Sequence, residues 1–92
     1  MPEENKTAAL LAFLWQKNKP LVDQRITELE QATEAPEKFE EAAATAHKLA
    51  GSLGMYGYPE AGQIASTLEL EFSSPAPQNL KEKVVALRNA LS

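Results

Sequence analysis

Residues 46–57 read AHKLAGSLGMYG and contain the only histidine of this 92-residue chain. On a helix surface, the neighbours of a residue are those three and four positions away. For His47 these neighbours are Ala43, Ala44, Ala50 and Gly51. None of them has a side chain larger than a methyl group, so a large partner could reach the imidazole. Histidine is also well suited to accept and hand on a group near neutral pH.

The sequence around this segment predicts an all-helical fold. Five of the six prolines precede segments with helical periodicity, and proline suits the first turn of a helix. The expected helices are residues 4–17, 20–33, 36–55, 59–72 and 77–91. Apolar residues recur three, four and seven positions apart, whereas the alternation typical of a half-buried strand is missing.

These elements predict one all-α domain, residues 1–92, because the length suits a single domain. Short connections favour antiparallel neighbours, so the last four segments should form an antiparallel four-helix up-and-down bundle. The first segment is apolar nearly all round, from Leu10 to Trp15. We therefore expect it to be an additional N-terminal helix that covers an open end of the bundle.

Composition excludes several classes of function. The formal net charge is −4, with 13 acidic and 9 basic residues, which disfavours nucleic acid or an anionic membrane as a partner. The chain has no cysteine, so a metal site could draw only on His47 and carboxylates, and none is expected. No apolar run approaches the roughly 20 residues of a membrane span. We expect a cytoplasmic monomer without a signal peptide or membrane insertion.

A helical wheel places His47 at the border of the core face, on the solvent side with Ala44 and Lys48. Glycine inside a helix costs about 1 kcal/mol relative to alanine. Gly51 is therefore interpreted as clearing space for a protein to approach the imidazole, with fraying of the helix as the alternative. For Gly54 and Gly57 the ordinary role of ending a helix is the preferred interpretation.

The segment from His47 to Gly57 resembles the signature of histidine-containing phosphotransfer (HPt) domains. The shared features are the histidine, a leucine two positions on, glycine and serine four and five positions on, and later glycines. The match in sequence covers residues 46–69, and the rest agrees in pattern only. The resemblance implies a carrier that moves a phosphoryl group between aspartates of receiver domains in a multistep phosphorelay. Its covalent phosphohistidine intermediate would make it a carrier and not a stand-alone enzyme.

The same resemblance implies partners and cofactors. Response-regulator receiver domains would be the partners, together with a hybrid histidine kinase. This chain would hold no cofactor of its own, because magnesium would lie in the acidic pocket of the receiver. Phosphoryl transfer needs positioning and charge neutralisation more than covalent help from the protein.

Residue by residue, the resemblance assigns His47 as the phospho-acceptor. Glu69 matches the position where the family carries glutamine or glutamate, and would hold the proximal ring nitrogen and fix its tautomer. Gln63 is a weaker candidate for that role. Lys48 would neutralise phosphate charge, with an ordinary solvated lysine as the alternative. The residues expected to contact the partner are Ala44, Gly51 and Ser52.

One position departs from the family pattern. Many members carry a lysine three residues after the histidine, whereas this chain has Ala50. Either Lys48 covers the phosphate contact alone or the phosphohistidine is less well stabilised.

Two other functions compete with the carrier. A bundle of the same fold could dock a receiver domain without being phosphorylated. An enzyme could use His47 as a general acid or base, although such catalysis usually needs a partner group and a substrate pocket. The small residues around His47 offer neither.

Overall fold

The computed structural model describes the backbone of residues 2–92 and the side chains of residues 7–92. Its helices are α1 (Pro2–Ala32), α2 (Phe39–Met55), α3 (Pro59–Phe72) and α4 (Leu80–Ala90), and a 3₁₀ turn, η1 (Pro36–Lys38), precedes α2. No strand occurs within residues 2–92. The prediction of an all-α fold is therefore confirmed.

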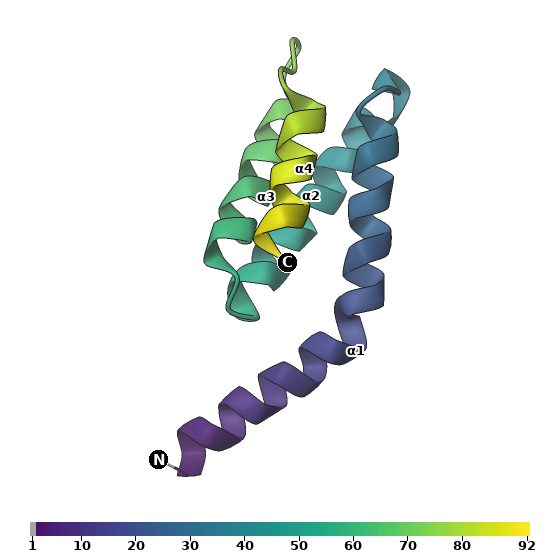
Figure 1. Ribbon diagram of the computed structural model, residues 1–92. Helices are drawn as coiled ribbons and strands as arrows, with labels where there is room; N and C mark the ends of the chain where they lie inside the picture. The colour runs from purple at the N-terminus through teal and green to yellow at the C-terminus, as the bar shows by residue number, and fades with distance from the viewer. Residues whose placement is uncertain (1) are drawn as a thin grey trace.

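The second part of α1 lies beside α2 and α4, with α3 on the far side of these two helices, and consecutive helices run in opposite directions (Figure 1). Each helix contributes an apolar stripe, with residues three or four positions apart, to one core. The largest fully buried side chains are Ile26, Leu29, Leu49, Leu53, Leu68, Val84 and Leu87. Burial of these stripes supplies the main favourable contribution to folding.

The N-terminal part of the fold differs from the prediction. The segments 4–17 and 20–33, expected as separate helices, form the single helix α1 with Pro20 inside it. Figure 1 shows that α1 bends and that its first part projects away from the bundle. A proline inside a helix removes one backbone hydrogen bond and commonly produces a kink. Leu10 and Phe13 are more than half exposed, so the covering of the bundle end is not confirmed.

Contacts around Trp15 attach α1 to the turn that follows α2. The Trp15 ring lies 5.6 Å from the ring of Tyr56 and 4.9 Å from that of Tyr58, measured between centroids. The Asn18 side-chain amide donates hydrogen bonds to the Tyr56 hydroxyl at 2.8 Å and to the Leu14 carbonyl at 2.9 Å. Trp15 is also the first described residue of the buried core.

The turn between α2 and α3 has a specific cause in the sequence. Gly57 has a φ of 93°, a conformation that favours glycine. The Tyr58 N–H donates to the Leu53 carbonyl and the Gly57 N–H donates to the Gly54 carbonyl, which is the Schellman pattern of a helix end. Pro59 then begins α3, where its missing N–H is harmless. The role predicted for Gly57 is thus confirmed.

The last helix begins later than predicted, at Leu80 and not at residue 77. Asn79, which precedes it, has a left-handed backbone with φ of 56°, and this conformation cannot continue a helix from the residues before it. The Glu71 carboxylate accepts a hydrogen bond from the Gln78 N–H at 3.0 Å, which holds the loop against the end of α3.

Helices α2 and α3 approach each other closely at Gly62. A Cβ atom added there would lie 3.2 Å from the Ala50 carbonyl oxygen and 3.4 Å from the Gly54 nitrogen. Gly54 thus lies in the last turn of α2, one residue before the end of the helix at Met55, and also forms part of this crossing. The small residues allow α3 to lie near enough to α2 for side chains of the two helices to meet.

Candidate functional site

His47 projects from the middle of α2 into solvent. Its side chain is 73% exposed, while Ala46 and Leu49 beside it in sequence are buried in the core. The wheel position predicted for the histidine therefore agrees with the structure. The fold provides a rigid base for the ring because α2 is helical on both sides of His47.

Glu69 on α3 holds one nitrogen of this ring. Both carboxylate oxygens of Glu69 lie 3.1 Å from Nδ1 of His47. An ionised carboxylate can only accept hydrogen bonds, so Nδ1 is the donor in this contact, and in the neutral ring Nε2 then keeps its lone pair. The contact brings together the two residues that the sequence resemblance paired. The Glu69 side chain is 35% exposed, next to the fully buried Leu68.

Gln63, the weaker candidate for that contact, forms no side-chain hydrogen bond with His47 among the described residues. Its backbone carbonyl accepts a hydrogen bond from the Thr67 hydroxyl at 3.1 Å, and its side chain is exposed. Gln63 lies nearly two turns before Glu69 on α3. The structure thus brings Glu69, and not Gln63, to the ring.

The space beside the imidazole is open. A Cβ atom built on Gly51 would have no heavy atom within 4 Å apart from its own helix backbone. Gly51 and Ala44 are both exposed, one turn on either side of His47. Gly51 also lies inside α2, four residues before its end at Met55, so the glycine does not end the helix.

The side chains of Lys48 and Ser52 differ in their interactions with the rest of the protein. Lys48 is exposed and forms no ion pair among the described residues. The Ser52 hydroxyl donates a hydrogen bond to the Lys48 carbonyl at 3.0 Å, so it is engaged with its own helix.

A residue that the sequence did not single out also reaches this surface. Arg25, on α1, lines a shallow depression together with His47, Lys48, Gly51, Ser52 and Met55. The sequence could not reveal that Arg25 lines this depression, because its place there depends on how α1 and α2 are aligned side by side.

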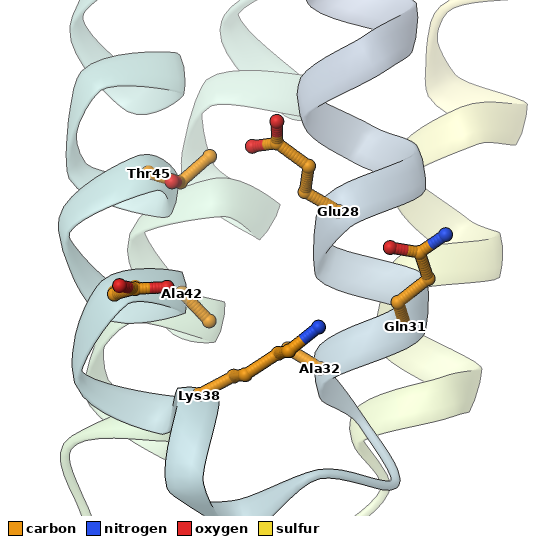
Figure 2. Close-up of a pocket in the computed structure, with 7 residues that line it drawn as sticks. Glu28, Gln31, Ala32, Lys38, Ala42 and Thr45 are labelled. Carbon is orange, nitrogen blue, oxygen red and sulfur yellow. The ribbon is translucent and has the colours of Figure 1, made fainter.

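A second depression lies between α1 and α2, away from His47 (Figure 2). The small buried side chains of Ala32 and Ala42 leave this space. Figure 2 shows Glu28 and Lys38 projecting over it from the two sides. Charges of both signs surround a floor of alanine side chains, so this depression does not favour a particular ligand or reaction.

The described residues contain neither a cluster of metal ligands nor a membrane-spanning helix. Within the described residues, no group of three or more histidine, cysteine, aspartate and glutamate side chains could hold a metal ion. None of the helices in that part of the chain is long and apolar enough to span a bilayer.

Of the comparisons with known proteins, the one with family models gives a match. A family model described as "Hpt domain" matches residues 14–92. The match begins next to Trp15, where α1 joins the core, and continues to the end of the sequence. No curated protein and no solved structure matches the chain.

Proposed function

Since the chain belongs to the Hpt domain family, we propose that it carries a phosphoryl group on His47 between receiver domains of a phosphorelay. Members of this family are phosphocarrier modules, and the family match implies phosphotransfer in general terms. The finer assignment to His47 rests on one observation. An exposed imidazole in the middle of a helix has its Nδ1 held by Glu69, so that Nε2 is left free for attack.

The chemical step follows from this tautomer. The Nε2 lone pair of His47 attacks the phosphorus of a receiver aspartyl phosphate. The N–P bond forms as the P–O bond breaks, and the electron pair of that bond stays on the aspartate carboxylate. No proton leaves the ring, which therefore gains a positive charge. The Glu69 carboxylate lies 3.1 Å from Nδ1 and stabilises that charge. Transfer to the next receiver is the reverse step.

In the proposed transfer step, the carrier has to supply few catalytic groups besides His47. Phosphoryl transfer depends on alignment and on charge neutralisation, and the receiver can supply magnesium and an acidic pocket. The proposed docking face contains His47, Lys48, Ala44, Gly51 and Ser52. The last three are small residues, which let another protein approach the imidazole. Response-regulator receivers and a hybrid histidine kinase are the proposed partners of a cytoplasmic monomer. The chain itself is proposed to form a single domain that needs no cofactor.

The competing functions receive less support. A docking module that binds receivers without phosphorylation would not need the tautomer set by Glu69, and the family match does not favour it. A general acid or base enzyme would need a substrate pocket, whereas the depression at His47 is shallow and open.

The direct test is chemical labelling of the wild type and of His47→Gln. The protein is incubated with phosphoramidate or with a phosphorylated receiver, and intact-mass spectrometry follows the added phosphate. We expect one phosphate on the wild type, labile in acid and stable in alkali, and none on His47→Gln. Receiver binding without any label on the folded wild type would instead support the docking module.

A further inference from the structure

The side chain of Arg25 has no partner among residues 7–92. It is half-buried on α1 and forms no hydrogen bond or ion pair among the described residues. The other arginine of the chain, Arg88, donates hydrogen bonds to Glu30 and to Thr27. The fold therefore engages one arginine with its neighbours and leaves the other available.

The position of Arg25 on the surface around His47 indicates a role for its side chain. It lines the depression that contains His47, and Lys48 lies there as well. No carboxylate lines that depression, although the chain as a whole carries a net charge of −4. Glu69 contacts the ring from α3, whereas Arg25 reaches this surface from α1. Arg25 and Lys48 thus line the same open depression as His47, whereas Glu69, which holds Nδ1, does not line it.

We propose that Arg25 binds the phosphoryl group on His47 and supplies a cation from α1. This inference rests on the proposed function, because it concerns the same phosphohistidine. A guanidinium presents several donors in a planar fork and can bind two phosphate oxygens at once. Lys48 adds a point charge from α2. Together the two side chains neutralise the dianion that the transfer step leaves on the imidazolium.

The test uses phosphoramidate, because this small donor phosphorylates His47 without any receiver. Its N–P bond breaks as the Nε2–P bond forms, and the protonated amine leaves as ammonia. Phosphorus NMR then follows the ionisation of the phosphoryl group on wild type, Arg25→Gln and Arg25→Lys. The matched control is Lys38→Gln, which removes one exposed cation beside the other depression. Far-UV circular dichroism establishes that each variant is folded.

Loss of a nearby guanidinium disfavours the dianion. We therefore expect Arg25→Gln to raise the second phosphoryl pKa by roughly half a unit or more. It should also slow labelling several-fold. Arg25→Lys should fall between Arg25→Gln and wild type, because it keeps the charge and loses the fork. Lys38→Gln should match wild type.

Three outcomes would overturn this assignment. Equal phosphoryl ionisation in Arg25→Gln and wild type would show that Arg25 does not touch the phosphoryl group. A defect seen only with a receiver as donor would place Arg25 in contact with the receiver. Absence of label on the wild type would instead refute phosphorylation itself, and the assignment of Arg25 with it.

Discussion

Replacing Gly51 should stabilise the fold and slow phosphotransfer from a receiver at the same time. Gly51 lies inside α2, and an added Cβ would meet no atom within 4 Å. Since glycine costs a helix about 1 kcal/mol relative to alanine, Gly51→Ala should raise the free energy of unfolding by about that amount. For a domain of this size, the melting temperature should rise by roughly 4–8 °C.

The functional cost of the same change comes from its distance to the imidazole. Residues four positions apart on a helix have Cβ atoms about 5–6 Å apart, so a side chain at Gly51 stands beside His47. The receiver must bring its phosphorus to about 3–3.5 Å from Nε2, and a misplacement of about 1 Å can cost about 100-fold in rate. Gly51→Gln should therefore slow transfer from a phosphorylated receiver by roughly 10- to 100-fold.

Two assays separate these effects. Thermal unfolding measures the stability gain of Gly51→Ala, and rapid-quench kinetics with a phosphorylated receiver measure the transfer rate of Gly51→Gln. Labelling by phosphoramidate serves as the control and should stay near the wild-type rate, since that donor needs little room. Transfer from the receiver at the wild-type rate in Gly51→Gln would refute the clearance argument.

Three further changes test other contacts. Gly62→Ala should lower the free energy of unfolding by about 1 kcal/mol, since crowding against α2 outweighs the gain in helix propensity; an increase in the melting temperature would contradict this. Glu69→Ala should mix the two tautomers of His47, seen in imidazole ¹⁵N shifts, and unchanged shifts would remove its positioning role. Lys81 lowers the pKa of Glu34 from its ordinary value of 4.5 through a hydrogen bond and its charge. Because this folded-state pKa is lowered, the pair stabilises the fold above about pH 4.5 and loses that effect as pH falls below it. Carboxyl NMR should show the pKa of Glu34 rising in Lys81→Gln, and an unaltered titration would disprove the pairing.

The sequence predicted much of the bundle because its signals are local. Pro59 and Gly57 act on their own backbone, so the start of α3 and the end of α2 follow from residue type alone. Pro20 led to a wrong prediction of a helix start, because its signal is also local. Proline favours a helix start, but a helix tolerates an internal proline with the loss of one hydrogen bond and a bend. Local preference could not decide between these outcomes.

The residues of the site also divide into those that the sequence indicates and those that only the packing of the helices brings together. His47 was evident as the only histidine among small residues, and the pairing with Glu69 came from the family resemblance. Nothing in the sequence relates Arg25 to His47, because their proximity depends on how two helices are aligned after packing. Gly62 was not singled out either, since a close approach of two backbones has no signal in one sequence.

The attachment of α1 through Trp15 has a spectroscopic consequence. Trp15 is the only tryptophan and is packed against Tyr56 and Tyr58, so its fluorescence reports on the bundle end. The described residues before it on α1 add no side chain to the core, although they are helical. Helical turns without buried contacts open at low free energy. On heating, the far-UV circular dichroism should therefore begin to fall before the tryptophan emission changes, and a single-transition fit to the dichroism would misjudge the cooperativity of the bundle.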